Sequence, residues 1–190
     1  HAEGRATRTG GLISDMKNSW LAELQKKNPS EIRLGLDRMV RLLERLDNPQ
    51  RAYPAVVVAG TNGKGSVTAM TASMLSAARY RVGWYISPHL VDVRERIRIG
   101  DQMISKKAMQ ACIEIVRSCQ AEELTYFEFL TAVAFVHFFR ASVDLAVLEV
   151  GMGGRLDATN VVDPHASVIT NISLEHREFL GDSLDRIAAE

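Results

Sequence analysis

The sequence predicts an α/β fold in which a mostly parallel sheet carries helices on both faces. Short apolar segments of strand length alternate along the chain with longer segments of helical length. The candidate strands are apolar throughout, as is typical of strands that are buried on both faces. With 190 residues and 46% hydrophobic content, the chain can bury one sizeable core.

The predicted helices are recognised by apolar residues at helical spacing. They span residues 31–47, 67–78, 106–119 and 126–139, and a last one begins near residue 182 with Asp182 or Ser183 as its cap. Arginines lie between the apolar positions of the first helix, and we expect them to form a solvated face. These are Arg33, Arg38, Arg41 and Arg45.

Four apolar runs are predicted strands, and each is followed by polar residues. The runs cover residues 55–59, 82–86, 144–150 and 167–172, the last two predicted as buried strands. Ligands of such folds bind at the carboxyl ends of the strands. Six polar residues that close or follow the runs are therefore expected at one edge of the sheet: Lys64, Ser66, Ser87, His89, Glu149 and His176.

The segment AGTNGKGS, which follows the first strand, predicts a phosphate-binding loop and a fold of the P-loop type. It departs from the common pattern G-x-x-x-x-G-K-[ST], because Gly65 separates Lys64 from Ser66 and Val58 occupies the place of the first glycine. Its glycines allow successive N–H groups to point at an anion. Lys64 would neutralise the outer phosphates, and the hydroxyl of Ser66 would bind Mg²⁺. A glycine-rich turn without a ligand is the alternative.

Other candidate residues have competing structural interpretations. Glu149 closes an apolar strand where P-loop proteins hold a metal, but it could also be a solvent-facing strand end. A single histidine such as His176 is more often structural, and Ser87 is a weak signal alone. Thr125 and Glu128 fit a helix capping box, and the aromatic residues beside them are expected in the core. The core candidates are Tyr126, Phe127 and Phe129.

Composition excludes several classes of partner. The 23 basic and 23 acidic side chains cancel, which disfavours binding to nucleic acid or to an anionic membrane and favours a small molecule. No apolar run is long enough to cross a bilayer or to act as a secretory signal. Cys112 and Cys119 are expected to be buried thiols in a reducing, cytoplasmic environment. Residues 1–19 are interpreted as a disordered lead or an expression remnant.

Five segments in order closely resemble the dihydrofolate synthase/folylpolyglutamate synthase family, whose members are related to the Mur ligases. They are AGTNGKGS, SPHL…ERIRI, TYFEFLTAVAF, LEVGMGGRLDATN and ITNISLEH…FLGDSLDRIAAE, and the resemblance runs from about residue 20 to the end. The family uses the phosphate loop with glycine between lysine and serine. The resemblance implies an incomplete Mur-ligase-like ATPase domain over residues 20–190, and an ATP-dependent ligase that joins glutamate to dihydropteroate or a folate through an acyl phosphate.

The resemblance also assigns roles to individual residues. It implies that ATP is bound by Gly60, Thr61, Asn62, Gly63, Lys64, Gly65 and Ser66. Magnesium ligands are expected at Ser66, Ser87, Glu149 and His176, with catalytic roles for Lys64, Glu149 and His176. Glu175 stands before His176 where family members frequently have Asp. The pterin or folate substrate is expected against Leu34, Gly35, Thr125, Tyr126, Phe127, Glu128 and Leu156.

One departure from the family pattern concerns the end of the chain. Family members continue with a KAGI segment, whose lysine helps to hold the metal, and with a separate C-terminal domain for ATP and glutamate. The chain stops at Glu190, so we expect it to be inactive alone and to need the remainder of its polypeptide. Two alternatives stay open: a Mur-like ligase with another carboxylate substrate, and a nucleotide-binding module without catalysis.

Overall fold

A six-stranded, mostly parallel sheet forms the centre of the computed structural model, which describes residues 22, 24–119 and 124–190. The strand order is β4-β3-β2-β5-β1-β6. β2, β5, β1 and β6 run parallel, whereas β3 and β4 pair antiparallel at one edge. The strands are β1 (Ala55–Ala59), β2 (Val82–Tyr85), β3 (Ile97–Ile99), β4 (Gln102–Met103), β5 (Leu145–Glu149) and β6 (Ala166–Ile169). The predicted fold class is confirmed, and the predicted lead at residues 1–19 lies outside the described residues.

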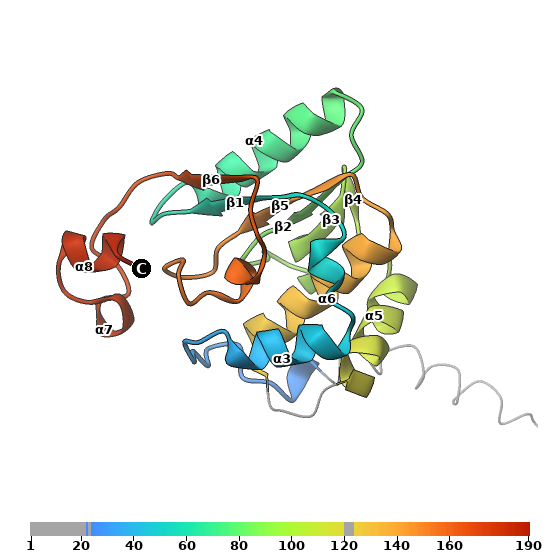
Figure 1. Cartoon of the computed structure of the whole chain (residues 1–190), viewed down its shortest axis with the longest axis horizontal. Coiled ribbons are helices and arrows are strands. Elements are labelled where there is room, and N and C mark those ends of the chain that lie inside the picture. Colours follow the sequence, from blue (N-terminus) through green and yellow to red (C-terminus); the bar gives the residue numbers. More distant parts are fainter. Residues whose placement is uncertain (1–21, 23, 120–123) are drawn as a thin grey trace, which may run out of the picture.

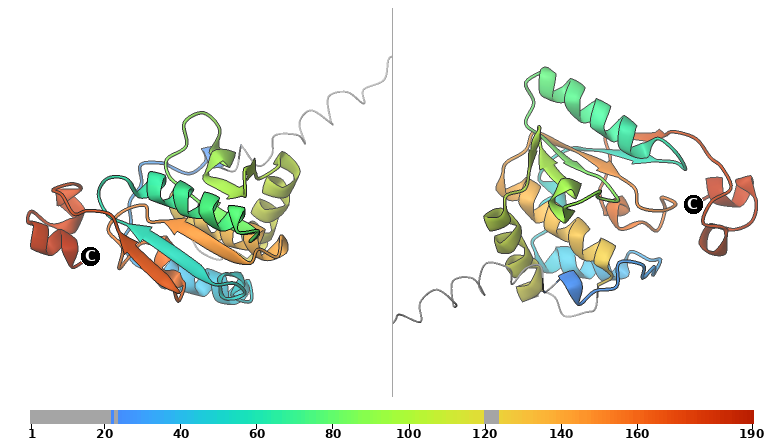
Figure 2. Two further views of the ribbon diagram at one scale, coloured as in Figure 1. Left: turned by 90° about the horizontal axis from the view of Figure 1, so that it is seen from above. Right: turned by 180° about the vertical axis from the view of Figure 1, so that it is seen from behind.

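Helices cover both faces of this sheet. α4 lies over one face, and α3, α5 and α6 gather over the other (Figures 1 and 2). The α-helices are α3 (Asp37–Arg45), α4 (Lys64–Ala77), α5 (Lys106–Cys119), α6 (Tyr126–Arg140), α7 (Arg177–Leu180) and α8 (Leu184–Ala188). Three short 3₁₀ helices are η1 (Pro49–Arg51), η2 (Val93–Arg96) and η3 (Ala158–Val161). Within the described part of the chain, no helix combines the length and the apolar character needed to span a membrane.

α6 forms the centre of the larger hydrophobic core. The helix is apolar on nearly every side, and its residues from Phe129 to Val136 are buried between the sheet and α5. Contact with the sheet is close, since a Cβ atom at Gly83 of β2 would lie 2.6 Å from the ring of Phe138. Phe129 and Tyr126 are buried as predicted, whereas Phe127 is only half-buried.

The first predicted helix is wrong over its first six residues. α3 begins only at Asp37, because Gly35 adopts a φ of +125°, which no helix accommodates. The prediction that its arginines form a solvated face is also wrong for Arg38. Its guanidinium pairs with Glu128 at the start of α6, with 2.7 Å between Nη2 and Oε1. The ion pair therefore fastens α3 to α6.

The prediction that the strand over residues 167–172 is buried is wrong. β6 lies at the edge of the sheet, beside β1, and Ile169 is 65% exposed. An apolar composition does not distinguish a central strand from an edge strand, because the neighbours of a strand are set by the tertiary fold.

Cys119 is half-exposed rather than buried, whereas Cys112 is buried as predicted. Near the end of the chain, Ser183 caps α8. It is one of the two residues predicted for this role, the other being Asp182.

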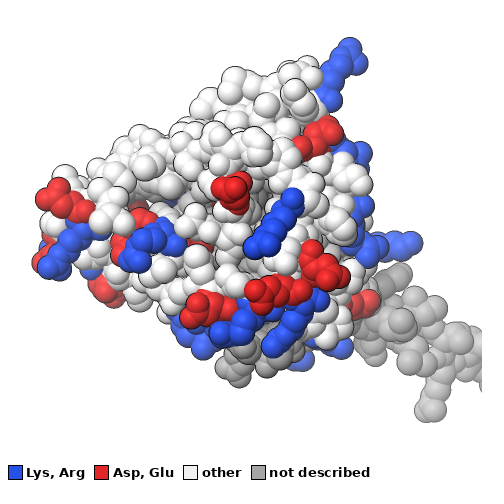
Figure 3. All heavy atoms as spheres, viewed as in Figure 1, with Lys and Arg blue, Asp and Glu red and all other residues white. Residues whose placement is uncertain are grey.

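Charges are mixed across the surface. In Figure 3, acidic and basic side chains alternate along the lower edge and the C-terminal lobe, between broad uncharged areas. Such a face offers no extended field of one sign, in keeping with the formal net charge of zero.

Candidate active site

The predicted phosphate-binding loop, here called the phosphate loop, leads from β1 directly into α4. Gly63 is the N-cap of the helix at a φ of +83°, a conformation that glycine adopts without strain. No side chain caps the helix, so its first N–H groups are available to an anion, and the positive end of the helix dipole points the same way. The ammonium of Lys64 donates to the carbonyls of Gly60, at 2.7 Å, and Thr61, at 3.0 Å, which holds it over the loop.

The segment after β6 locks the phosphate loop in place. The N–H groups of Thr61 and Asn62 both donate at 2.8 Å to Asn171, one to its backbone carbonyl and the other to its side-chain oxygen. Thr170 donates from its hydroxyl to the carbonyl of Asn62 at 2.7 Å. Contact is so close that a Cβ atom at Gly60 would lie 2.2 Å from the Thr170 hydroxyl. The anion-binding capacity of the loop therefore rests on the N–H groups from Gly63 onward.

Neither Thr170 nor Asn171 was singled out from the sequence. In the structure both follow β6 at the carboxyl edge of the sheet, but the strand predicted over residues 167–172 included them, so they were not recognised as residues that follow a strand. Their partners on the phosphate loop lie more than a hundred residues earlier in the chain, so only the pairing of β1 with β6 brings them together.

Glu149 is a buried carboxylate at the end of β5, with 4% of its surface exposed. Its Oε2 atom accepts a hydrogen bond from the N–H of Ser87 at 2.9 Å. Burial raises the pKa of Glu149, while the Ser87 N–H, Lys64 and Arg96 oppose that rise. The alternative interpretation of Glu149 as a solvent-facing strand end is therefore wrong.

Gly65, the residue that breaks the common phosphate-loop pattern, lies against this carboxylate. A Cβ atom at position 65 would stand 3.5 Å and 3.6 Å from the two Glu149 oxygens. Any side chain there would cover the face of the carboxylate that points at the start of α4. The inserted glycine thus keeps Glu149 accessible from the phosphate loop.

The other two predicted metal ligands are less closely placed. His176 is exposed, has a φ of +48° before α7, and lines both cavities described below. Ser66 is exposed on the first turn of α4 and lines neither of them. Among the described residues, no group of three or more His, Cys, Asp or Glu side chains lies close enough together to hold a metal ion. Of the four predicted magnesium ligands, only Glu149 and His176 are residues of these four types.

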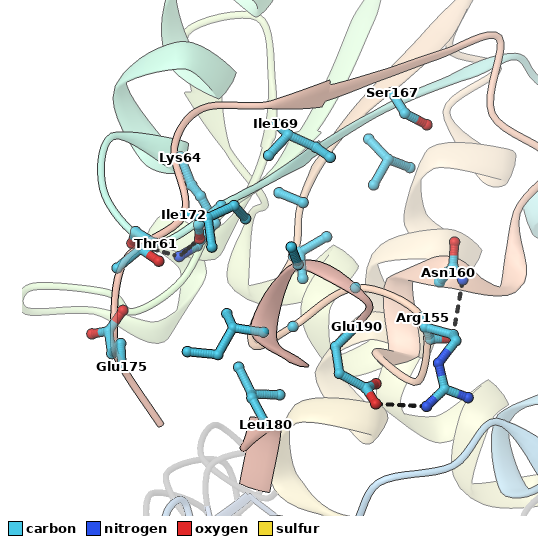
Figure 4. A pocket seen from close by; sticks show the side chains of 18 of the residues that line it. Thr61, Lys64, Arg155, Asn160, Ser167, Ile169, Ile172, Glu175, Leu180 and Glu190 are labelled. Carbon is cyan, nitrogen blue, oxygen red and sulfur yellow. Dashed lines mark hydrogen bonds and ion pairs between the residues drawn. The ribbon is translucent and has the colours of Figure 1, made fainter. Parts of the chain in front are cut away.

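A phosphate-loop cavity of about 190 Å³ opens beside Lys64 (Figure 4). Thr61 and Lys64 come from the loop, whereas Ile169 and Ile172 come from β6 and the segment after it. On the opposite side, Arg155 pairs with Glu190, with 2.6 Å between Nη2 and Oε1. The cavity therefore combines an apolar wall with the loop that leads into the uncapped start of α4.

A second cavity, here called the aromatic hollow, measures about 370 Å³. It is lined by six of the seven residues predicted to contact the substrate: Leu34, Thr125, Tyr126, Phe127, Glu128 and Leu156. Gly35 does not line it. Ser87 and His176 do, so the hollow reaches the same edge of the sheet as the phosphate loop. A flat aromatic molecule with polar edges would fit such a lining.

The capping box at the start of α6 forms one wall of the aromatic hollow. Thr125 accepts from the N–H of Glu128 at 3.3 Å, and Glu128 accepts from the N–H of Thr125 at 2.7 Å. The predicted capping box is confirmed. Because Arg38 also pairs with Glu128, the carboxylate that faces the hollow is held by two partners.

Asp157 is a buried carboxylate that sequence reasoning missed. Its Oδ2 accepts from the N–H groups of Gly151 and Met152, and its Oδ1 accepts from the N–H and the hydroxyl of Thr159. Burial raises its pKa, against these hydrogen bonds. Its position in LDATN before a short helix was a sequence signal for an N-cap. Asp157 therefore shapes the floor of the hollow.

Residues 58–190 match the family profile described as the Mur ligase middle domain. The chain belongs to the Mur ligase family. Among similar Mur ligase relatives, the dihydrofolate synthase/folylpolyglutamate synthase of Haemophilus influenzae is 44% identical over 171 residues, which cover 90% of this chain and 39% of the relative. The protein of the same name from Escherichia coli is 42% identical over 173 residues, covering 90% and 41%.

Solved structures of Mur ligase relatives have the same fold as this chain. FolC of Escherichia coli in complex with DHPP and ADP superposes with a TM-score of 0.84 at 42% identity, covering 90% of this chain and 42% of that one. An FPGS–AMPPCP–folate complex gives a TM-score of 0.84 at 36% identity, covering 90% and 44%. The resemblance seen in the sequence is confirmed. The chain spans about two fifths of the length of the relatives it matches.

Proposed function

We propose that this chain supplies the phosphate loop and the acid-substrate cavity of an ATP-dependent ligase that joins glutamate to dihydropteroate or a folate. One observation carries the proposal: two different cavities share His176, and each is lined by a neighbour of the buried carboxylate Glu149, which itself lines neither. The first is lined by Lys64 and the second by Ser87, whose N–H binds Glu149, while His176 lines both. A ligase of this kind must bring a terminal phosphate and a carboxylate together, and the two cavities provide for both.

The phosphate loop is proposed as the ATP site. The uncapped start of α4 and the Lys64 ammonium would bind the phosphates, and the Asn171 contacts would keep the loop in shape. All seven residues from Gly60 to Ser66 are part of this proposal. Thr61 and Asn62 would act by positioning, since their N–H groups are already used.

The donor set around Glu149 fits Mg²⁺. Its carboxylate is buried, forms no ion pair among the described residues, and accepts one hydrogen bond there, so oxygen lone pairs remain for a cation. Glu149, Ser87, Ser66 and His176 would hold the ion together with phosphate oxygens of ATP, since Mg²⁺ is commonly bound by few protein ligands and by substrate phosphates. The bound ion would neutralise charge that develops on the transferred phosphoryl group.

The proposed chemistry has two steps. A carboxylate oxygen of the acid substrate attacks the terminal phosphorus of ATP, and the bond to ADP breaks, which leaves an acyl phosphate. The amino group of glutamate then attacks the acyl carbon, phosphate leaves, and the nitrogen loses a proton. Lys64 would stabilise the negative charge that moves between the phosphate oxygens. The aromatic hollow would hold the acid substrate so that its carboxylate faces Glu149 and the phosphate loop.

The relatives support the choice of ligands. One solved structure is a FolC with DHPP and ADP, and another is a bifunctional folylpolyglutamate synthase/dihydrofolate synthase with Mn, AMPPNP and L-glutamate, 40% identical with a TM-score of 0.81. We propose the same classes of ligand here, a cytoplasmic location, which the free thiols of Cys112 and Cys119 support, and the participation of further residues of the same polypeptide for glutamate binding. Nucleic acid and membranes are not among the proposed partners.

The test uses the full-length polypeptide with ATP, Mg²⁺, glutamate and either dihydropteroate or a reduced folate. Mass spectrometry should show a product heavier by one glutamyl residue, with one ADP formed per product. Reactions without glutamate or without the pterin acid serve as controls. Phosphate release that depends on an unrelated carboxylic acid would favour another Mur-type amide ligase. Tight ATP binding without product from any acid would favour a nucleotide-binding module.

A further inference from the structure

The motif ERIRI contains a buried cation that the proposed chemistry has not used. Arg96 is 8% exposed and lines the aromatic hollow together with Ser87, Tyr126 and Glu128. Its guanidinium carbon lies 5.4 Å from the centre of the Tyr126 ring. Within the part of the chain that the structure describes, no carboxylate pairs with it. A buried guanidinium normally has an anionic partner, because desolvating the charge is costly.

The acidic side chains of the hollow are already satisfied elsewhere. Glu128 pairs with Arg38, Asp157 accepts hydrogen bonds from its own loop, and Glu31 pairs with Arg33 at 3.3 Å. Arg33 is the other arginine that lines the hollow, and its side chain is 40% exposed in that pair. Arg96 is thus the buried positive charge of this cavity that is matched to no acidic group of the described chain.

His89 fixes the orientation of Arg96. The Nε of Arg96 donates to Nδ1 of His89 at 2.9 Å, which ties one edge of the guanidinium to the SPHL loop. The Tyr85 hydroxyl is a further neighbour of this side chain. The remaining N–H groups of the two terminal nitrogens lie in one plane, the geometry that binds a carboxylate through two hydrogen bonds. His89 lines a different cavity, so it holds Arg96 without contacting the contents of the hollow.

Arg96 also lies on the reacting side of the hollow. Arg96 lines the hollow together with Ser87, whose N–H donates to Glu149 at 2.9 Å. Lys64 belongs to the phosphate-loop cavity and Arg96 to the aromatic hollow. An acid held by Arg96 would therefore lie in the cavity that reaches Glu149 through Ser87 and shares His176 with the phosphate-loop cavity.

We propose that Arg96 binds the carboxylate of the acid substrate through its terminal nitrogens, and that His89 is a positioning residue that holds the Arg96 guanidinium in place. The inference rests on the proposed function and adds a specificity determinant to it. It makes a distinct statement about binding: the hollow prefers a carboxylate to an uncharged group of the same shape. Recognition of an acid by a buried cation strengthens binding about 10- to 100-fold over the neutral analogue.

The test compares binding of pteroate with binding of its carboxamide, titrated by calorimetry against the full-length protein with ADP and Mg²⁺. The wild-type protein should bind the acid about 10- to 100-fold more tightly than the carboxamide. Arg96→Met should remove most of this preference while leaving the affinity for the carboxamide near its wild-type value. Arg96→Lys, which keeps the charge, should restore part of it.

Arg98 offers a matched control in the same motif. Its guanidinium carbon lies 5.3 Å from the centre of the Trp84 ring, almost the same cation–aromatic distance as for Arg96, but it does not line the hollow. Arg98→Met should therefore leave the preference for the acid unchanged. His89→Leu should weaken that preference, and His89→Asn, which keeps an acceptor near the position of Nδ1, should recover part of it.

Each outcome bears on a different statement. If wild-type protein binds acid and carboxamide equally, or if Arg96→Met and Arg98→Met change the preference alike, the role of Arg96 is overturned while the ligase proposal stands. If the wild-type protein binds neither compound, the proposed function and this inference fall together. Thermal melting identifies any variant that has not folded. In that case the comparison of pteroate with its carboxamide in the wild-type protein still tests the role of Arg96.

Discussion

Two buried carboxylates lie eight positions apart along the chain that leaves β5, and their surroundings differ. Asp157 accepts from three N–H groups and one hydroxyl, so both of its oxygens are used. Glu149 accepts from one N–H group and is bordered by Lys64 and Arg96, neither of which pairs with it directly. Burial raises the pKa of both carboxyl groups. A buried carboxylate whose oxygens accept hydrogen bonds from its own loop has a structural role. A buried carboxylate with acceptor positions still open can bind a ligand.

The contrast extends to the regions around each residue. The loop of residues 151–157 is closed on itself around Asp157, which is the N-cap of η3. The region around Glu149 is an assembly of segments that are distant in sequence: the start of α4, the Ser87 turn and the segment after β6. Loss of a contact in the first region should cost stability, and loss of a group in the second should cost activity.

The largest expected effect is that of Lys64→Ala on activity. The Lys64 ammonium sits over the phosphate loop and contributes nothing to the hydrophobic core. In the full-length protein, ligation should fall by about 10²- to 10³-fold, because a positioned charge at the transferred phosphate is lost. The free energy of unfolding should change by no more than about 0.5 kcal/mol. A large loss of stability with normal ATP turnover would contradict the assignment.

Next in size is the effect of Glu149→Gln on the magnesium requirement. The amide keeps the shape of the side chain and can still accept from Ser87, but it binds a cation weakly. The Mg²⁺ concentration for half-maximal activity should rise about 10- to 100-fold, with little change in the binding of pteroate. An unchanged magnesium titration would leave Glu149 as an acceptor for the Ser87 N–H alone.

Asp157→Asn should show the opposite pattern. The amide nitrogen must face one of the two donor pairs that Asp157 now accepts from, so buried N–H groups lose their partners. We expect the free energy of unfolding to fall by about 2–4 kcal/mol, measured by urea denaturation. The magnesium titration of the folded variant should stay at the wild-type value. A variant of full stability would remove the structural role given to Asp157.

The smallest expected effect concerns pH. The folded-state pKa of Glu149 lies above that of the unfolded chain, so its contribution to stability is fully present below the unfolded pKa and is lost as pH rises through the folded pKa. Glu149→Gln removes this loss. The melting temperature of the variant minus that of the wild-type protein should therefore increase as pH rises above the pKa of an unfolded glutamate, about 4.3.

Asp157 shifts in the same direction but is present in both proteins, so it cancels from this comparison. A constant difference across the pH range would show that the carboxylate is not desolvated. A difference that decreases with pH would show that a cationic side chain dominates its surroundings.

Much of the fold could be predicted from the sequence, because local patterns are set by neighbouring residues. Apolar runs identified β1, β2 and β5, and the Thr125–Glu128 capping box marked the start of α6 correctly. The start of α3 was missed because the conformation of Gly35 overrides an amphipathic pattern that continues through it. β3 and β4 are too short for a periodic signal.

The sequence by itself determined the fold class, the alternation of the longer strands and helices, the glycine-rich loop after β1 and most of the positions where polar residues follow strands. These depend on spacing of a few residues, on which backbone geometry acts directly. Only the tertiary structure decided which of those residues meet. Sheet order placed β5 beside β1 and β2, and so brought Glu149 next to Gly65 and Ser87. Burial and pairing then separated Glu149 from Asp157 and left Arg96 in the hollow without an acidic partner in the described chain, because both depend on contacts between segments far apart in sequence.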